Sequence, residues 1–590
     1  MEYIIRKYIE SDYHSIIEVM AYSFSDLYKK MFRFDNEELI NFLEDINIVP
    51  KNQADGFFVA EIDGNIVGMV NLKWKSLKLG SRLEILKLSS KYSNRKVFRA
   101  IIAKLTLFER VAANECYIDN ITVLKEYRGL GITRSLHGRA EEFALDKKLN
   151  KLTIHISESS KELETLNKQL GFRTRKIFKS SIIGRFIEEE SFKYMVKTPG
   201  VNPNQLNIGM FTDTYMPQIN GVATSIYSLA KELEKMGHKV YIITIKDKGR
   251  RCEFNGEILR VPGISLHLLK GTDYKLANIL SSDKIEKIIK DMNLDIIHSH
   301  TEFSIGLLAT YVAKKYMIPQ VHTYHTMYDE WIHYVTNFEP FQKIAVEFIK
   351  MYMKGFTGVC QKIIVPTEKT KEVLTGYKVA TDMVIIPTGI DFSKFVVQEG
   401  HEKVKELKEE LYLNEDDFVC LNISRLSKEK KVAAVIENVK RVIEKNPRVK
   451  LIIIGDGPER SNLEKLAESY KENIKFLGRV PWDQIGYYYK LGDAFVVASR
   501  FETQGLTVIE ALSSTIPVIC PDDDAFLNIV EDGENGLIFT SDDEIEEKIL
   551  KLLDEEIYKY IYSNTTNSVL RYSSEYFAES ILKEYNSLLV

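Results

Sequence analysis

Residues 495–512 read FVVASRFETQGLTVIEAL, and this stretch decides the fold expected for the C-terminal part of the chain. The run from Phe495 to Ser499 is short and apolar or small, which is typical of a buried strand. A loop through residues 500–502 separates it from a helix whose N-terminus we place at residues 504–507. A strand that passes through a short loop into a helix is the repeating unit of a parallel α/β sheet.

Two acidic residues flank the start of this predicted helix, Glu502 in the loop and Glu510 in the second turn. Glu510 is placed to accept hydrogen bonds from ribose hydroxyls, and Glu502 from the hydroxyls of a sugar. Acids at a helix N-terminus also simply complement the helix dipole, so this stretch alone leaves both interpretations open. The first-turn amides, to which a diphosphate can bind, are those of Gln504, Gly505, Leu506 and Thr507.

A second strand-to-loop transition carries two cations. Residues 418–423 predict a strand, and the sequence SRLSKEK that follows contains Arg425 and Lys430. Arginine can bind phosphate through two parallel hydrogen bonds, and lysine supplies a point charge. As solvated loop charges they would be unremarkable. Their combination with the two acids favours a site for a diphosphate.

A third transition lies near the start of the C-terminal two-thirds of the chain. Residues 206–212 predict a strand, and a helix with one apolar face begins near Gly221. A glycine there allows close approach of a ligand, and free amides at a helix N-terminus suit a phosphate. An ordinary strand-to-helix turn is the alternative. Further along, the predicted strand at residues 320–323 runs into His325, at the strand end where α/β sheets bind ligands.

The organisation of the chain follows from these elements. A chain of 590 residues predicts three or four domains. The sequence TPGVNPNQ at residues 198–205 interrupts the periodicity and separates a domain at 1–197 from the rest. We predict one Rossmann-like lobe over 206–390 and a second over 391–570. A helix at 571–590 has one apolar face that needs a partner surface, which we expect on the first lobe.

The ordered motifs FTDTYMPQINGVATSI, SRLSKEK, IIIGDGPER, FLGRV and SRFETQGLTVIEAL resemble those of family-four retaining glycosyltransferases, which have the GT-B fold. The resemblance implies an α/β enzyme that uses a nucleotide sugar and binds no metal. The acidic run at 522–524 falls where the family has a glycine-containing loop, and we expect it on the surface. By resemblance, the site comprises Gly221 beside the diphosphate, His325 facing the sugar, Arg425 and Lys430 on the phosphates, Gly478 and Val480 at the base, and the pair Glu502 and Glu510.

The motifs HTYHTMYDEWIHYV, VPTEKT and IPTGID are most similar to the diacylglycerol glucosyltransferase subgroup. That similarity implies transfer of a hexose from a UDP-sugar, UDP-glucose in particular, to a lipid hydroxyl. A soluble or polymeric acceptor of the cell envelope is the alternative. The run from Trp331 to Met353 is rich in aromatic and branched residues, and membrane contact and packing between helices are equally consistent with it.

The N-terminal domain has a different pattern. A hairpin signal at 63–65 and the predicted strand YIDNITV at 117–123 precede a glycine-containing turn, and the segment LNKQLGF follows at 166–172. These features resemble the GNAT acetyltransferase family and imply binding of acetyl-CoA. The family's usual catalytic tyrosine falls at Asn167, so acetyl transfer and a non-catalytic binding module both stay open. The turn, whose last position departs from the usual Gly or Ala, comprises Arg128, Gly129, Leu130, Gly131, Ile132 and Thr133.

Composition sets the remaining limits. Hydrophobic residues make up 45% of the chain, as in globular proteins, and the net charge of −4 argues against a nucleic-acid binder. Five dispersed cysteines without a CxxC pair are typical of a reducing compartment. We find no signal peptide and no run of about 18 apolar residues, and we expect a cytoplasmic protein. Residues 73–110 carry eleven Lys or Arg against two Glu, so a peripheral contact with the inner face of an anionic membrane and a solvated helix face are both open.

Overall fold

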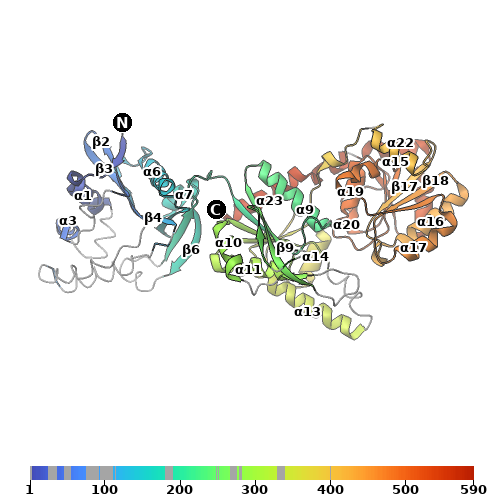
Figure 1. Cartoon of the computed structure of the whole chain (residues 1–590), viewed down its shortest axis with the longest axis horizontal. Coiled ribbons are helices and arrows are strands. Elements are labelled where there is room, and N and C mark those ends of the chain that lie inside the picture. The colour runs from blue at the N-terminus through green and yellow to red at the C-terminus, as the bar shows by residue number, and fades with distance from the viewer. Residues whose placement is uncertain are drawn as a thin grey trace. The chain divides into compact units, whose positions relative to one another are not determined.

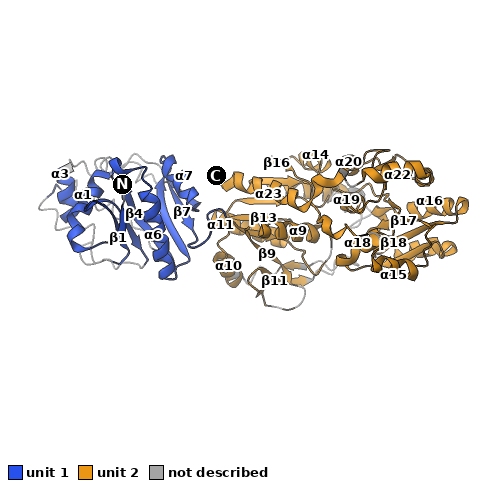
Figure 2. Ribbon diagram, turned by 90° about the horizontal axis from the view of Figure 1, so that it is seen from above, with its two compact units in different colours: residues 1–205 blue, residues 206–590 orange. Residues whose placement is uncertain are grey.

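The computed structural model describes residues 3–23, 36–45, 55–74, 92–93, 111–112, 114–179, 191–218, 220–246, 249, 251–265, 275–277, 282–327, 339–398, 400–565 and 567–589. The chain forms two compact units, residues 1–205 and residues 206–590 (Figure 2). Most of the basic run at 73–110, and the residues from Trp331 to Phe338 of the aromatic run, lie outside the described residues.

Unit 1 is built around a seven-stranded sheet with the order β1-β2-β3-β4-β5-β7-β6 (Figure 1). Neighbouring strands are antiparallel except β4 and β5, which are parallel. The predicted hairpin joins β2 to β3, and Asp63 and Gly64 both have positive φ in its turn. The strands are β1 (Ile4–Lys7), β2 (Phe57–Ile62), β3 (Asn65–Lys73), β4 (Glu115–Val123), β5 (Lys151–Ser157), β6 (Arg173–Lys179) and β7 (Ser191–Lys197).

Helices cover both faces of this sheet. Along β2, Phe57 and Val59 pack into one hydrophobic cluster, whereas Phe58 and Ala60 pack into another. This alternation is the expected period of a strand that is buried on both faces. The first cluster includes side chains of α1 (Tyr13–Ser23) and α3 (Asn36–Asp45), and the second includes side chains of α6 (Ile132–Asp146). A further helix, α7 (Lys161–Gln169), lies between β5 and β6 in sequence.

Unit 2 contains two sheets, and the first has nine strands. Its order is β10-β11-β9-β8-β13-β14-β15-β16, with β12 paired to β11, and all neighbours are parallel except the pairs of β11 with β10 and β12. The strands are β8 (Asn207–Phe211), β9 (Lys239–Lys246), β10 (Glu253–Phe254), β11 (Ile258–Ser265), β12 (Lys275–Ala277), β13 (Ile296–Ser299), β14 (Gln320–Thr323), β15 (Lys362–Val365) and β16 (Met383–Ile385). Helices α9 (Gly221–Lys235), α10 (Ser282–Asp291), α11 (Ser304–Tyr316), α13 (Glu339–Thr357) and α14 (Glu368–Gly376) belong to this lobe.

The second sheet has six parallel strands in the order β19-β18-β17-β20-β21-β22. They are β17 (Phe418–Ile423), β18 (Val449–Ile454), β19 (Ile474–Gly478), β20 (Ala494–Val496), β21 (Val518–Pro521) and β22 (Gly536–Phe539). The helices of this lobe are α15 (Glu402–Glu410), α16 (Val432–Lys445), α17 (Arg460–Ala467), α18 (Ile485–Tyr489), α19 (Leu506–Ser513), α20 (Asp524–Leu527), α21 (Ile545–Leu552) and α22 (Glu555–Asn564). Both parallel sheets agree with the Rossmann-like lobes predicted from the sequence.

The last helix, α23 (Ser574–Leu589), packs against α9 of the first lobe. Phe577, Ile581 and Tyr585, which the sequence places on one apolar face, are buried in the same cluster as Ile226 and Leu229 of α9. The C-terminal segment therefore covers the first sheet rather than the second, as Figure 1 shows for α23 and α9.

Polar contacts join the two lobes. The Gln504 side chain accepts a hydrogen bond from the Thr388 amide at 2.7 Å and donates one to the Thr388 carbonyl at 2.9 Å. Lys369 of α14 donates to both carboxylate oxygens of Asp523 at 2.9 Å. Asp523 was expected to be a surface residue, but only 13% of its side chain is exposed because this ion pair crosses between the lobes. Its neighbours Asp522 and Asp524 are exposed, as expected.

Candidate active site between the two lobes

The second sheet reverses its strand order between β17 and β20, because β18 and β19 extend on one side and β21 and β22 on the other. Open parallel sheets bind ligands beyond the carboxyl ends of strands at such a point. The loops that leave these two ends carry Lys430 and Glu502, and the Lys430 Nζ donates to the Glu502 Oε1 at 2.5 Å. About a fifth of each side chain is exposed, 22% and 20%. Arg425, on the same loop as Lys430, is exposed.

Glu510 lies in α19, and its half-buried side chain lines the pocket between the lobes. The Tyr489 hydroxyl of α18 donates to the Glu510 Oε2 at 2.7 Å. Burial raises the pKa of Glu510 to about 7, although the Tyr489 hydrogen bond and the positive charge of Lys394 both act to lower it. The carboxylate is therefore poised close to neutral pH, and its ionisation depends on its neighbours.

The start of α19 requires a glycine. Gly505, the N-cap residue, has a φ of 73°, and a Cβ atom there would overlap the ring of Phe526. The helix begins at Leu506, within the predicted range of 504–507, and the Gln504 side chain just before it is hydrogen-bonded to Thr388 across the lobes. Leu506 and Thr507 then occupy the first turn, where backbone amides lack intrahelical partners.

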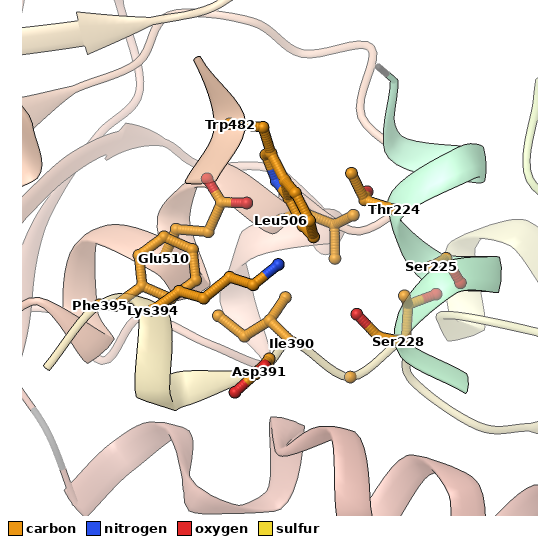
Figure 3. A pocket seen from close by; sticks show the side chains of 12 residues that line it. Thr224, Ser225, Ser228, Ile390, Asp391, Lys394, Phe395, Trp482, Leu506 and Glu510 are labelled. Carbon is orange, nitrogen blue, oxygen red and sulfur yellow. The ribbon is translucent and has the colours of Figure 1, made fainter. Parts of the chain in front are cut away.

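A pocket lies between the lobes (Figure 3). From the second lobe Leu506, Glu510 and Trp482 line it, and from the first lobe α9 contributes Thr224 and Ser225. The remaining lining residues come from α9 and from the segment that joins the sheets: Ser228, Thr388, Gly389, Ile390, Asp391, Lys394 and Phe395. The hydroxyl oxygen of Ser225 is buried and makes no hydrogen bond within the described part of the chain.

Gly221 is the first residue of α9, and Asn220 caps this helix by accepting from the Ala223 amide at 2.9 Å. A Cβ on Gly221 would meet the Leu506 Cδ1 at an ordinary distance of 3.7 Å. Gly221 and Leu506, which the sequence assigned to different lobes of one site, are thus neighbours. The protein's own atoms therefore do not demand a glycine here, and a requirement for it would come from a ligand.

The segment expected to meet the nucleotide base follows β19. Gly478 has a φ of 71°, and a Cβ there would approach the Arg460 guanidinium at 3.0 Å. Val480 is half-buried and packs against the same hydrophobic cluster as Ile485 and Tyr489. Arg460, at the start of α17, was not singled out from the sequence; its guanidinium lies near Gly478 and donates to the Glu464 carboxylate at 2.8 Å.

In the first lobe, four histidines gather at the carboxyl ends of β13 and β14. His300 Nδ1 lies 3.1 Å from His325 Nε2, and the two rings stack with centroids 5.4 Å apart. His300 also stacks on His298, whose Nδ1 lies 2.6 Å from the hydroxyl of Tyr585 in α23. Burial lowers the pKa of His325 to about 3 and the pKa of His300 well below its usual value, so both rings are neutral.

The fourth histidine belongs to a separate hydrogen-bond network. His322 Nε2 lies 3.1 Å from Glu302 Oε1, and its Nδ1 lies 3.1 Å from the Ser299 hydroxyl. Asp213, after β8, accepts from Thr301 at 2.6 Å and is held in place by this loop. Within the described residues no group of three or more His, Cys, Asp or Glu is arranged to hold a metal ion.

In unit 1, the glycine-containing turn joins β4 to α6. Gly129 and Gly131 have φ values of 85° and 83°, and Gly131 is the N-cap residue of α6. Arg128 donates from its Nε to the Val123 carbonyl at 3.3 Å, and Thr133 lies in the first turn. Asn167, at the position of the family's tyrosine, is 1% exposed and donates to the Leu163 carbonyl of its own helix at 2.8 Å. An amide with this environment cannot protonate a thiolate.

Sequence reasoning missed Lys394 and Trp482, which line the pocket, and Tyr489 and His300, which contact the predicted site residues Glu510 and His325. Each lies far in sequence from the residue that it contacts, so no local spacing connects them. His300 is the exception, because the apolar run before the sequence HSH at 298–300 could have been predicted as a strand that ends in a pair of imidazole rings. Among the described helices, none is both long and apolar enough to cross a membrane.

Two lobes, each built on a largely parallel sheet, with a pocket between them, are typical of the GT-B class of glycosyltransferase folds. Comparison with known proteins agrees with this class. Residues 219–394 match the model of "Glycosyltransferase Family 4", residues 403–568 match "Glycosyl transferases group 1", and residues 21–172 match the "Acetyltransferase (GNAT) family". The chain belongs to the family-four glycosyltransferases and carries an N-terminal GNAT-family segment.

Individual relatives are similar over most of their length. The α-monoglucosyldiacylglycerol synthase of Acholeplasma laidlawii is 36% identical over 396 residues, which are 65% of this chain and 98% of that protein. The enzyme of the same name from Streptococcus pneumoniae is 36% identical over 351 residues, 59% of this chain and 78% of that one. The crystal structure of Anabaena Alr3699/HepE with UDP is 15% identical and superimposes with a TM-score of 0.52, covering 64% of this chain and 99% of HepE. That likeness shows the fold.

Proposed function

We propose that this protein is a retaining hexosyltransferase that moves a sugar, glucose in the first instance, from a UDP-sugar to the hydroxyl of a lipid such as diacylglycerol. The observation that carries the proposal is the pocket between the lobes, which Glu510 and Leu506 line together with Thr224 of α9. The two glucosyldiacylglycerol synthases that are 36% identical to the chain over the aligned residues support the choice of sugar and acceptor. We also propose the boundaries 1–197, 206–390 and 391–570 for the domains.

In this proposal each site residue has a chemical role. Glu510 accepts from the ribose, and the amides of Leu506 and Thr507 receive the diphosphate together with Arg425 and Lys430. Gly478 and Val480 border the base, and Glu502 and His325 contact the transferred sugar. The cations act where negative charge develops as the bond from the sugar C1 to the diphosphate breaks.

Retention of configuration requires attack from the face that the diphosphate leaves. The acceptor oxygen then forms its bond to C1 on that face while the bond to the diphosphate breaks. The proton of the acceptor hydroxyl passes to the departing diphosphate oxygen, so the reaction needs no separate general base. The neutral, buried ring of His325 suits a hydrogen-bonding role rather than proton transfer.

A donor and acceptor screen tests this function. Purified full-length protein is given UDP-, GDP- or ADP-glucose with diacylglycerol in mixed micelles, and nucleotide release and lipid product are measured. We expect turnover with UDP-glucose and an α-configured product, which proton NMR of the glycolipid identifies. If turnover occurs only with a soluble or polymeric cell-envelope acceptor, that acceptor is the substrate and the lipid is not. A β-configured product would contradict retention of configuration.

A surface of the first lobe supports contact with a membrane. On α13, Ile344, Phe348 and Met351 lie one helical turn apart and are 67%, 60% and 65% exposed. Exposed side chains also follow one face of α11, at Phe303, Leu307 and Tyr311. Apolar side chains at this spacing form a stripe, and an exposed stripe of this size marks an interaction surface.

Lysines accompany this stripe. Lys343 and Lys354 are exposed beside it on α13, and Lys350 pairs with Glu347 at 2.7 Å. An apolar stripe next to a row of cations fits a membrane surface that contains anionic lipids. We propose that the protein meets the inner face of the cell membrane through this surface, in the cytoplasm, where it would reach its lipid acceptor.

For unit 1 we propose binding of acetyl-CoA at the turn of Gly129 and Gly131, whose positive φ angles turn successive amides into a cradle for a pyrophosphate. The buried amide of Asn167 favours a binding module over an acetyltransferase that relies on this position. Acetyl-CoA titrated calorimetrically into the full chain should bind, and Gly131→Val should weaken it. Steady hydrolysis or transfer of acetyl groups would show that the unit is catalytic.

A further inference from the structure

A lysine lies between aromatic rings from the two lobes. Lys394 ends a short 3₁₀ helix, Phe392–Lys394, in the segment that joins the two sheets. Its Nζ is 2.9 Å from the ring centroid of Trp482 in the second lobe and 5.3 Å from that of Tyr227 on α9. The two rings meet edge to face at 5.7 Å. We call Tyr227, Lys394 and Trp482 the aromatic clasp.

The aromatic clasp borders the pocket that contains Glu510. Lys394, Trp482 and Glu510 all line it, and Figure 3 shows the Lys394 side chain extending into the pocket that the Glu510 side chain also lines. A lysine on a tryptophan face is common at protein surfaces, where the contact has little consequence. Here the Lys394 side chain is half-buried and shares a pocket with the half-buried carboxylate of Glu510, so water screens the two charges less than it does at the surface.

The pKa of Lys394 and the pKa of Glu510 each depend on the charge of the other side chain. Burial and the like charge of Lys231 lower the pKa of Lys394 to about 8, against the opposing charges of Asp391, Asp483 and Glu510. Burial raises the pKa of Glu510 to about 7, and the groups that oppose this are the Tyr489 hydroxyl and the Lys394 ammonium. The positive charge of Lys394 thus favours the ionised form of Glu510 near neutral pH.

We propose that Lys394 is a positioning residue for donor binding. The rings of Trp482 and Tyr227 hold its side chain, and its ammonium keeps Glu510 ionised, so that this carboxylate accepts hydrogen bonds from the hydroxyls of the nucleoside. The inference rests on the proposed function, because it assigns Glu510 to the ribose. It adds a residue outside the motifs that identify the family, and it links donor binding to the contact between the lobes.

Nucleotide binding should depend on pH in a definite direction if Lys394 keeps Glu510 ionised. Protonation of Glu510 removes an acceptor, so nucleotide binding weakens as the pH falls through the pKa of this group. Without the Lys394 charge, that pKa rises, and the acid limb of the binding curve moves upward by about one pH unit. Above about pH 9 wild type and variant converge, because Lys394 has then lost its own proton and Glu510 is ionised in both.

The test measures the dissociation constant of UDP for the full-length protein by calorimetry between pH 5.5 and 9.5. We compare wild type with Lys394→Met, which keeps the apolar stem, and with Lys394→Arg, which keeps the charge. Lys235→Met is the matched control, because Lys235 is an exposed lysine of α9 outside the pocket. Circular dichroism checks the fold of each variant, and Lys394→Gln replaces Lys394→Met if the latter does not fold.

We expect Lys394→Met to weaken UDP binding about tenfold at pH 6.5, with little change at pH 9.5. Lys394→Arg and Lys235→Met should keep the wild-type acid limb. The inference is wrong if the plot of UDP affinity against pH for Lys394→Met runs parallel to that of the wild type at all pH values. It is also wrong if Lys394→Arg binds UDP as weakly as Lys394→Met does. In either case the proposed function stands. If UDP does not bind the wild type at any pH, and GDP and ADP do not either, the proposed function fails, and the inference with it.

Discussion

His300 Nδ1 lies 3.1 Å from His325 Nε2, and the two imidazole rings are stacked with an angle of 24° between their planes. Since both rings are neutral, one nitrogen of the pair carries the proton and the other accepts it. This hydrogen bond fixes the orientation and tautomer of His325, and the ring of His300 is in turn stacked on His298, which contacts α23 through Tyr585. The C-terminal helix is thereby connected to the proposed sugar site.

The first prediction concerns this pair. His300→Phe keeps the ring stack but removes the hydrogen bond to His325, so we expect kcat to fall about tenfold or more, with an unchanged donor KM. The fold should tolerate the change, because His300 is buried and its Nε2 finds no partner within the described residues. His300→Asn, whose side chain can replace the Nδ1 contact, should recover much of the activity. Equal losses in both variants would argue for a purely structural role.

The second prediction concerns the ion pair of Lys430 and Glu502. If they act on the diphosphate and sugar as a unit, Lys430→Met and Glu502→Gln should each lower kcat by about 100-fold or more. The double variant should then be little worse than either single one, since groups that act together are not additive. Lys428→Met is the control, because this exposed lysine belongs to the same short helix. Full additivity would show that the two residues act independently.

A third prediction addresses the donor itself. Glu510→Ala and Arg425→Ala should each cost roughly 2–4 kcal/mol of transition-state stabilisation, or about 30- to 1000-fold in kcat/KM. Glu510→Gln removes the negative charge but retains an acceptor for the Tyr489 hydroxyl. It therefore distinguishes the effect of the lost charge from the effect of lost packing. Arg448→Ala, another exposed arginine of this lobe, should have no effect. Near-normal kinetics in either alanine variant would contradict the site.

The sequence predicted much of this fold and less of its site. Strands at 320–323 and 418–423 were placed with their observed bounds, and the second of them, FVCLNI, is the largely apolar run that is typical of a buried parallel strand. Lys430 and Glu502 were assigned to one site from two loops, and the structure brings them into contact. The start of α19 at Leu506 lies within the predicted range of 504–507, but the sequence cannot show that Gln504 is hydrogen-bonded to Thr388, more than a hundred residues away.

The residues that sequence reasoning missed depend on tertiary contacts. Lys394 and Trp482 are unremarkable in their own segments, and they become informative only where the chain brings them beside Glu510. In the same way, Asp523 was interpreted as part of a surface acidic run, although its partner Lys369 lies in the other lobe. A single sequence contains no signal for such pairs.

The fourth prediction is metal independence. Arg425, Lys430 and the first turn of α19 supply positive charge for the diphosphate in our proposal. Transfer should therefore continue in excess EDTA at a rate within about twofold of the untreated enzyme, an estimate that follows if the protein's own groups provide the electrostatic stabilisation. Donor turnover is measured before and after dialysis against the chelator. Loss of activity that magnesium or manganese restores would require a metal-assisted mechanism instead.

The last prediction concerns the membrane surface of α13. Replacing Ile344, Phe348 and Met351 together by Ser removes the apolar stripe without touching the buried face of the helix, where Met353 and Phe356 pack. We expect flotation with vesicles that contain anionic lipid to fall several-fold, because burying each of these side chains is worth about 1.5–3 kcal/mol. Activity on a soluble short-chain diacylglycerol should persist. Val396, Tyr412 and Leu570, equally exposed residues, replaced together by Ser, serve as the matched control.

Added salt and truncation of the chain distinguish membrane binding through α13 from membrane binding through the basic run at 73–110. Attraction through that run is electrostatic and fades over a Debye length of about 8 Å at physiological salt, so it should weaken steeply with added salt and vanish in a chain that begins at Leu206. Binding through α13 should survive both changes. If the serine variant of α13 floats like the wild type while the shortened chain does not, the basic run is the docking element. If neither full-length protein floats, a soluble or polymeric acceptor becomes the better hypothesis, because a lipid substrate would then have no route into the cleft.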